Sequence, residues 1–376
     1  MSKKRNAHNR SSRKLNKKRT GFILLFVVPL VMLLAGGAAY AANLFKTTEN
    51  ILESSYQEIE RSEPVEKVNP IEEPISILLM GIDDDDERGL GSARADSIIY
   101  ATVNPETHQL DMVSIPRDTY VPIMNKGQEV KMDRINTAYA IGEENAVVET
   151  VETFLGLPVN YYATFNFHSF LDVIDALGGI DVDVPVDIVE MDSKDNSKAV
   201  TLEKGLQTLD GEQALALART RKIDDDIARG QRQQLVIKSV INKATDLGSI
   251  TKYNDILRGI GSNMRTNMKM NEIKSVLQTG LNESFDTESH VFEWTSFKNA
   301  GRDLVKIEPS SFEDIQQSLS ESLELEEQTI NDITDGVEAQ DVLDESEDDG
   351  RYSKDYPQTD LKKRSGSALA GSDSYE

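Results

Sequence analysis

An uncharged run near the N-terminus, residues 21–42, constrains this chain more than any other feature. At a helical rise of about 1.5 Å per residue the run spans about 33 Å, which is enough to cross a bilayer. Basic residues immediately before it predict an N-terminus in the cytoplasm and everything after the span outside. The alternative is a cleaved signal peptide, because Ala39-Tyr40-Ala41 resembles a processing site. The run exceeds the ~7–15 residues of a signal core, so we predict a single-pass protein of the cell membrane.

Charge is distributed unevenly along the chain. The net charge is −24 over 376 residues, yet the first twenty residues contain nine Lys or Arg and no acid. The remainder has 32 basic and 65 acidic side chains, a balance that repels nucleic acid and argues against it as a partner. The chain has no cysteine, which excludes a disulfide framework and a thiolate zinc site.

These patterns divide the chain into five segments. The acid-rich end has few apolar residues, and both ends are predicted to be disordered. The segments are a basic cytoplasmic arm at 1–20, a transmembrane helix at 21–42, a proline-containing stalk at 43–74, an extracytoplasmic domain at 75–322 and an acidic tail at 323–376.

The domain mixes strand patterns with helix patterns. Strands are predicted at 75–80, 94–103, 109–118, 161–167, 180–184 and 291–297. Helices are predicted at about 144–155, 168–177, 227–247, 252–262 and 270–280.

Charged residues lie at the ends of the first three predicted strands. Asp83 follows the first strand, Arg94 and Asp96 open the second, and Arg117 and Asp118 close the third. If these strands are neighbours, the carboxylates of Asp83 and Asp96 can share one hard cation. Mg²⁺ is commonly held by one or two carboxylates together with substrate phosphate oxygens. Asp118 is predicted to orient Arg117 or to cap the next segment.

A second group of cations lies within fourteen residues of the chain, as Arg219, Arg221, Arg229 and Arg232. A helix from residue 227 onward would place Arg229, Arg232 and Gln233 on one face. Guanidinium groups match phosphate oxygens in a bidentate fork, so we predict a phosphate or pyrophosphate partner. The alternatives are nucleic-acid binding and surface ion pairs with the three aspartates at 224–226, which would contribute little energy.

Six segments in order carry a family resemblance. They are ILLMGID (77–83), RADSI (94–98), VSIPRD (113–118), RINTAYAIG (134–142), DALGGIDVDV (175–184), and DGEQALALARTR with DIARGQRQQ (210–234). Together they resemble the LytR-CpsA-Psr family of cell-wall assembly proteins over about residues 75–250. The resemblance implies one membrane helix followed by a single extracytoplasmic α/β/α domain on a mixed central sheet.

The resemblance also implies an activity. Members of this family take anionic glycopolymers, such as wall teichoic acid, from an undecaprenyl-pyrophosphate carrier. They attach the polymer to the N-acetylmuramic acid of peptidoglycan as a phosphodiester. The implied partners are therefore the lipid-linked glycopolymer, peptidoglycan and the membrane, and the implied cofactor is Mg²⁺ with Mn²⁺ as an alternative.

Residue roles follow from the matching positions. Asp83 and Asp96 match the family's magnesium-binding aspartates. The residues that match a pyrophosphate-binding role are Arg94, Arg117, Arg219, Arg221, Arg229 and Gln233. We expect Arg94, Asp96 and Arg117 to carry catalysis. This chain has RADS where RSDT is usual, and RIN replaces KIN, which puts the role of Arg134 in doubt.

Positioning and electrostatics would carry most of the catalysis in such a transfer, because both phosphoryl groups need charge neutralisation. The general base stays open: Asp96 is one candidate, but a metal-bound carboxylate is a poor base, and a substrate phosphate is the other. Three other functions compete with the transferase: a non-catalytic polyprenyl-phosphate binder, a lipid pyrophosphatase and a transcriptional regulator. The regulator rests only on the basic arm, which the topology explains equally well.

Overall fold

The computed structural model describes residues 55–60, 68–83, 93–220, 226–246, 264–282, 285–299 and 301–325. Within these ranges no helix is both long and apolar enough to cross a membrane. The predicted arm at 1–20 and membrane helix at 21–42 lie outside them, as does almost all of the predicted tail.

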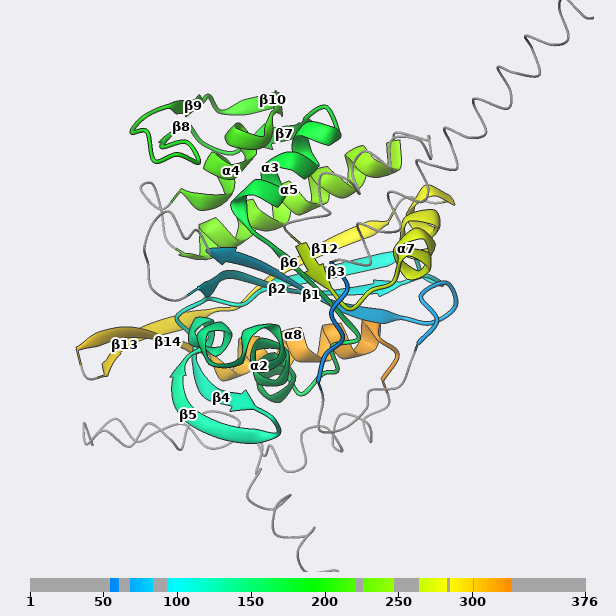
Figure 1. Cartoon of the computed structure of the whole chain (residues 1–376), viewed down its shortest axis with the longest axis vertical. Helices are drawn as coiled ribbons and strands as arrows, with labels where there is room; N and C mark the ends of the chain where they lie inside the picture. Colours follow the sequence, from blue (N-terminus) through cyan, green and yellow to red (C-terminus); the bar gives the residue numbers. More distant parts are fainter. Residues whose placement is uncertain are drawn as a thin grey trace, which may run out of the picture. The chain divides into compact units, whose positions relative to one another are not determined.

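A six-stranded mixed sheet forms the centre of the domain (Figure 1). In spatial order its strands are β11 (Met264–Thr266), β6 (Tyr161–Phe165), β1 (Ile75–Asp83), β2 (Arg94–Asn104), β3 (Gln109–Ser114) and β12 (Asp286–Val291). The pairs β1–β6 and β3–β12 are parallel, and the other pairs are antiparallel. The predicted mixed α/β fold is therefore confirmed.

Helices cover both faces of the sheet, which explains why the central strands are apolar on both sides. One face packs on α2 (Ala138–Leu155) and α8 (Pro309–Ser322), and the other on α5 (Asp226–Asp246) and α7 (Met270–Asn282). Along β1, Leu78 and Met80 are buried toward α2 and α8, whereas Ile75 is buried toward α5 and α7. Because successive side chains of a strand point to opposite faces, β1 contributes residues to two separate cores.

A smaller layer lies beyond α5. Its elements are α3 (Phe167–Ala176), β7 (Ile180–Val184), β8 (Ile188–Glu190), β9 (Val200–Leu202), β10 (Gly205–Leu209) and α4 (Gly211–Arg219). Its buried apolar residues form their own cluster, to which Val236 and Ala244 of α5 contribute. An Asp210–Gln213 capping box starts α4, which fixes where this helix begins.

Two hairpins extend from the domain, and neither was predicted as a hairpin. The first joins β4 (Tyr120–Asn125) to β5 (Gln128–Arg134) through Lys126 and Gly127, both with positive φ. The second pairs β13 (Trp294–Asn299) with β14 (Arg302–Ile307). The strand predicted at 291–297 is therefore wrong as one element, since β12 ends at Val291 and Trp294 opens β13.

Most predicted elements occur where expected, with one correction near the candidate site. Strand β3 ends at Ser114, so Arg117 and Asp118 lie in a turn after the strand and do not close it. The helices predicted at 144–155, 168–177, 227–247 and 270–280 correspond to α2, α3, α5 and α7. The helix predicted at 252–262 lies outside the described residues.

Part of the predicted stalk contacts the domain. Tyr56 forms a parallel bridge with Thr266 of β11, and the amide of Gln57 donates to the carbonyl of Thr266 at 2.8 Å. The hydroxyl of Tyr162 donates to the carbonyl of Gln57 at 2.9 Å, and Ile59 is buried in the core. Residues 55–60 thus extend the edge of the sheet beside β11.

Candidate active site

A β-bulge shapes the edge where β1 ends and β2 begins. Gly81 pairs with Ser97 and Ile82 pairs with Ala95, so Asp96 is an extra residue without a partner on β1. Asp83 pairs with Arg94. A bulge of this kind re-aims a side chain, and here it places the carboxylate of Asp96 beside the end of β1. The two predicted metal-binding aspartates therefore lie on neighbouring strands, as expected.

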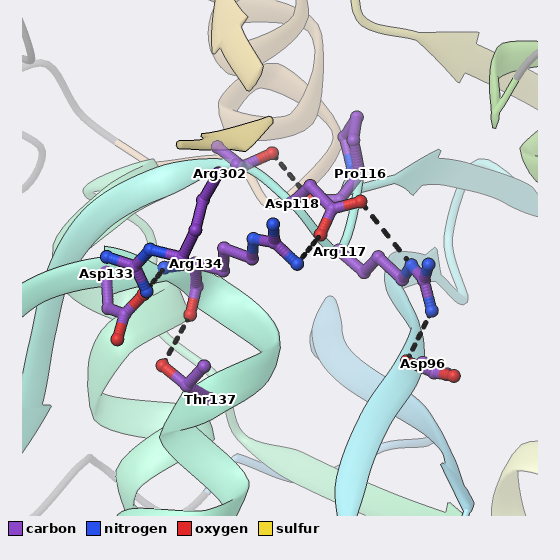
Figure 2. A network of polar contacts seen from close by, with 9 residues as sticks. Asp96, Pro116, Arg117, Asp118, Asp133, Arg134, Thr137 and Arg302 are labelled. Atoms are coloured by element: carbon purple, nitrogen blue, oxygen red, sulfur yellow. Dashed lines mark hydrogen bonds and ion pairs between the residues drawn. The ribbon is translucent and has the colours of Figure 1, made fainter. Parts of the chain in front are cut away.

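Arg117 connects this edge to the turn after β3 (Figure 2). Its Nη1 donates to Oδ1 of Asp96 at 3.0 Å, and its Nε lies 3.5 Å from Oδ2 of Asp118. The other oxygen of Asp118 lies 3.1 Å from Nη1 of Arg134. Asp96, Arg117, Asp118 and Arg134 thus form a chain of alternating charge. Asp118 thus contacts Arg117, in agreement with the prediction that it orients this arginine or caps the next segment.

The turn that carries Arg117 is fixed by its backbone. The amide of Thr119 donates to the carbonyl of Pro116 at 3.0 Å, and the amide of Asn136 donates to the carbonyl of Arg117 at 3.2 Å. Asn136 is buried in the 3-10 turn, residues 135–137, that precedes α2. The guanidinium group of Arg117 therefore projects from a backbone held on both sides.

Helix α5 reaches the same edge because a glycine allows close packing. A Cβ at Gly230 would lie 2.9 Å from Oγ and 3.0 Å from Cβ of Ser114. The flanking turns of α5 carry Arg229, which is 5% exposed, and Gln233. Oε1 of Gln233 accepts from the hydroxyl of Ser97 at 2.9 Å, and its Nε2 donates to the carbonyl of Ala218 at 3.3 Å. Gln233 therefore links the sheet to the end of α4.

A small cavity, open to solvent, lies between α5 and the ends of the strands. Asp96, Arg229 and Gln233 line it, so the structure brings three predicted site residues together. Its other polar residues are Ser97 and Ser114. Its apolar lining residues are Ile98, Ile115, Pro116, Ile227, Val291, Phe292 and Trp294. A lining with both polar and apolar residues suits a ligand with both characters.

Arg219 and Arg94 are placed differently. Arg219, the last residue of α4, stacks over the ring of Phe167, with Cζ 5.7 Å from its centroid. It donates to the carbonyl of Asp192 at 3.1 Å and lies 3.5 Å from the carboxylate of Asp195. It does not line the cavity, although Ala218 beside it contacts Gln233. Arg94 is exposed and makes no ion pair within the described part of the chain.

Of the two remaining arginines of the second group, the structure describes only Arg232. Arg221 lies outside the described residues. Arg232 is buried, and it donates to the carbonyl of Leu217 at 3.1 Å and to that of Thr220 at 2.7 Å. Because these carbonyls terminate α4, Arg232 holds α4 against α5.

Sequence comparison places this site in a known context. The LytR_cpsA_psr family model matches residues 43–321. The chain belongs to the LytR-CpsA-Psr family. The match spans every described helix and strand apart from the last residue of α8. The site described above therefore lies wholly within the match.

Named relatives and solved structures of the LytR-CpsA-Psr family agree with this assignment. The chain is 36% identical over 319 residues to the polyisoprenyl-teichoic acid–peptidoglycan teichoic acid transferase TagU of Bacillus subtilis (strain 168), covering 84% of this chain and 99% of the relative. A solved structure described as "TagT bound to LIIa-WTA" is 31% identical with a TM-score of 0.62, covering 72% of this chain and 100% of that one. The crystal structure of B. subtilis TagU is 36% identical with a TM-score of 0.53, covering 68% and 99%.

The donor set at the sheet edge fits the metal that the LytR-CpsA-Psr resemblance implies. Asp83 and Asp96 offer carboxylate oxygens on neighbouring strands, with Asp83 half-buried and the Asp96 side chain 37% exposed. Oxygen-only donors suit Mg²⁺ and Mn²⁺. Arg117 already contacts one oxygen of Asp96, so a cation there would share that carboxylate with a guanidinium group.

Sequence reasoning missed several residues that build the LytR-CpsA-Psr site. Ser97 and Ser114 lie inside predicted strands, and nothing in their neighbourhood separates them from ordinary strand residues. Gly230 did carry a signal, because a glycine inside a helix costs about 1 kcal/mol and usually has a packing reason. Trp294 lies inside the strand predicted at 291–297, and nothing around it in the sequence marks it as a site residue.

Proposed function

We propose that this protein is a membrane-anchored phosphotransferase. Its substrate would be an anionic glycopolymer, such as wall teichoic acid, linked to an undecaprenyl-pyrophosphate carrier. Its product would be that polymer joined through a phosphodiester to the N-acetylmuramic acid of peptidoglycan. The family membership and the transferase names of the relatives support this assignment.

One observation carries the proposal. Asp96, which Arg117 contacts, lines the same cavity as Arg229 and Gln233. Carboxylates, guanidinium groups and an amide around one cavity are what a pyrophosphate bridging a metal and cations requires. The apolar lining residues offer a surface for the non-polar part of a lipid-borne donor.

The reaction would exchange one P–O bond for another. The acceptor hydroxyl oxygen attacks the phosphorus attached to the sugar, and the bond from that phosphorus to the bridging oxygen breaks. The bridging oxygen leaves with the bonding electrons as part of polyprenyl phosphate. The hydroxyl proton passes to Asp96 or to a phosphate oxygen, so charge and atoms balance.

The residues of this chain would divide the work by position. Arg117 and Arg229 would neutralise negative charge that grows on the transferring group and the leaving phosphate. Asp118 would keep Arg117 aimed at the site by holding its Nε side. Gln233 would orient a phosphate oxygen, and Arg94 and Arg219 would contact the parts of the donor farther from the cavity.

Asp83 and Asp96 would hold Mg²⁺, or Mn²⁺ in its place. When bound, such a cation neutralises phosphate charge and orients phosphate oxygens.

The proposed location follows from the sequence. Residues 21–42 would anchor the chain, with the arm at 1–20 in the cytoplasm and the domain at 75–322 outside. An anchor of this kind keeps the site near a lipid-borne donor, and the peptidoglycan acceptor lies on the same side of the membrane.

The proposal is tested by reconstituting transfer with the full-length chain. The mixture contains a polyprenyl-pyrophosphate-linked saccharide, Mg²⁺ and peptidoglycan oligomers, and the products are released polyprenyl phosphate and a saccharide–peptidoglycan adduct detected by mass. We expect both products from the wild type, and a loss of at least about a hundredfold in rate for Arg117→Ala.

Other outcomes point elsewhere. Release of lipid phosphate together with a free saccharide phosphate, and no adduct, would make the protein a pyrophosphatase. Binding of the donor without turnover would make it a carrier or scaffold. No turnover, together with wild-type donor binding by Arg117→Ala, would end the proposal for this site.

A further inference from the structure

A second cluster of possible metal ligands lies where the edge strand β12 pairs with β3, and none of its residues lines the cavity. Strand β12 pairs in parallel with β3, and Glu288 is directly opposite Asp111. His290 lies two residues farther along β12, on the same face as Glu288. One ligand atom from each of the three side chains lies within 4.8 Å of the others.

The spacing suits a small coordination sphere. Nε2 of His290 lies 3.4 Å from Oδ1 of Asp111. Two ligands at about 2.1 Å from a tetrahedral Zn²⁺ are separated by roughly 3.4 Å. The present distance is long for a hydrogen bond between an imidazole and a carboxylate, but it matches two ligands of one metal.

Asp111 gives the cluster a fixed and fully buried ligand. Its side chain is 0% exposed, and within the described residues it forms no ion pair with Lys or Arg. Nε2 of Gln109 donates to Oδ1 at 3.1 Å, and the hydroxyl of Thr102 lies 3.4 Å from Oδ2. A buried carboxylate without a permanent cation beside it calls for a positive partner.

Exposure to solvent increases across the three side chains, from Asp111 through His290 to Glu288. The side chain of His290 is 12% exposed, and Glu288 is exposed with no hydrogen bond or ion pair in the described part of the chain. A metal could therefore enter from solvent and keep an open position there. A plain Asp111–His290 pair would give Glu288 no role, whereas a metal site would use it.

The donor set selects a class of metal. One imidazole nitrogen with two carboxylate oxygens suits Zn²⁺ and neighbouring transition metals, whereas Mg²⁺ prefers oxygen ligands only. We propose that Asp111, Glu288 and His290 form a Zn²⁺-class site, separate from the Asp83–Asp96 edge.

Such a site would fasten the edge strand to the domain. The carbonyl of His290 accepts from Nε2 of Gln234 at 3.0 Å, so β12 is already held on the α5 side. A metal would hold it on the α8 side, where Thr102 contacts Ser322 at 2.8 Å. Val291 and Phe292, which follow directly, line the cavity, so the metal would also steady that wall.

The test is Zn²⁺ titration of the chelator-stripped full-length chain by calorimetry, with excess Mg²⁺ present throughout. We expect a saturable equivalent of Zn²⁺ that Glu288→Gln and His290→Gln each weaken by at least about tenfold. At saturating Zn²⁺ the melting temperature of the wild type should rise by about 5 °C, and that of Glu288→Gln should not.

Matched controls separate this site from other binding. Asp286→Asn removes an exposed carboxylate from the same strand and should leave Zn²⁺ binding unchanged, as should Asp83→Asn. Because Glu288 makes no contact that folding needs, the apo form of Glu288→Gln should melt like the wild type. Wild-type Zn²⁺ affinity in Glu288→Gln, or no saturable binding by the wild type, would overturn the proposal. Neither result bears on the transferase, whose proposed residues do not include Asp111, Glu288 or His290.

Discussion

Arg117 donates from Nη1 to Oδ1 of Asp96 at 3.0 Å, across 21 positions of sequence. The same carboxylate is the one that we assign to a divalent cation. A guanidinium group and a cation would therefore compete for one oxygen, and Asp118, 3.5 Å from Nε, gives Arg117 a second anchor when Asp96 is engaged.

The first prediction follows from that competition. Arg117→Ala should bind Mn²⁺ more tightly than the wild type, by about three- to tenfold, because it frees Asp96 and removes a nearby positive charge. Electron paramagnetic resonance of Mn²⁺ titrations measures this directly. Arg94→Ala removes the same charge from an exposed residue that forms no ion pair with any other described residue, so it should tighten binding less. Equal effects of the two variants would mean that the Asp96 contact is irrelevant to the cation.

Asp118 should act as a positioning residue. Asp118→Asn keeps its shape but removes the charge that Arg117 and Arg134 share, so kcat/KM for the transfer should fall about ten- to a hundredfold. Asp133→Asn is the matched control, because Asp133 pairs with Lys131 and Arg302 instead. Equal loss of activity in both variants would indicate general damage to the hairpin.

Gly230 should be irreplaceable for steric reasons. Gly230→Ala places a methyl group 2.9 Å from Oγ of Ser114, which should push α5 from β3 and destabilise the protein by about 1–3 kcal/mol. The shift would also displace Arg229 and Gln233 and so reduce donor binding. Denaturant unfolding of the single variants and of Gly230→Ala/Ser114→Gly measures the coupling. If Ser114→Gly restores none of the lost stability, the close approach is not the cause.

Asp133 should make the folding stability of the protein decrease at acidic pH. Burial favours a higher pKa, but hydrogen bonds from Lys131 and the Arg134 amide and the charge of Arg302 hold the pKa of Asp133 below its usual value. Its stabilising contribution is therefore complete above the unfolded pKa and is lost as pH falls through the lower folded pKa. Urea unfolding between pH 6 and pH 3 should show a smaller decline for Asp133→Asn than for the wild type. Parallel declines would refute this assignment.

The local hydrophobic pattern of the sequence predicted the elements near the site well. It failed where tertiary contacts decide where an element ends. The apolar run before Asp83 and the strand opened by Arg94 were both recovered, because buried strands leave a clear signature. The third strand was extended too far, since Ile115 and Pro116 continue the apolar pattern while the backbone turns. The first hairpin was missed because its turn uses Lys126 and Gly127 in place of a stronger turn pair.

The arginines show the same limit. Spacing placed Arg229 and Gln233 on one face of a helix, and both do line the cavity. Arg219 was expected beside them, but α4 ends there and Thr220 is extended, so its side chain meets Phe167 and the Asp192 region. The bulge at Asp96 has no sequence signal, because it depends on the register between two strands.

That bulge has a consequence for how the chain tolerates change. Ala95 and Ile98 face one core, while Arg94 and Ser97 face the other way, so removing residue 96 would restore perfect alternation without moving a single apolar contact. The shortened strand would be the more regular one, and the protein should remain folded. Regularity of the strand and the proposed chemistry are thus opposed at this position, because the added residue is the one to which we assign the cation.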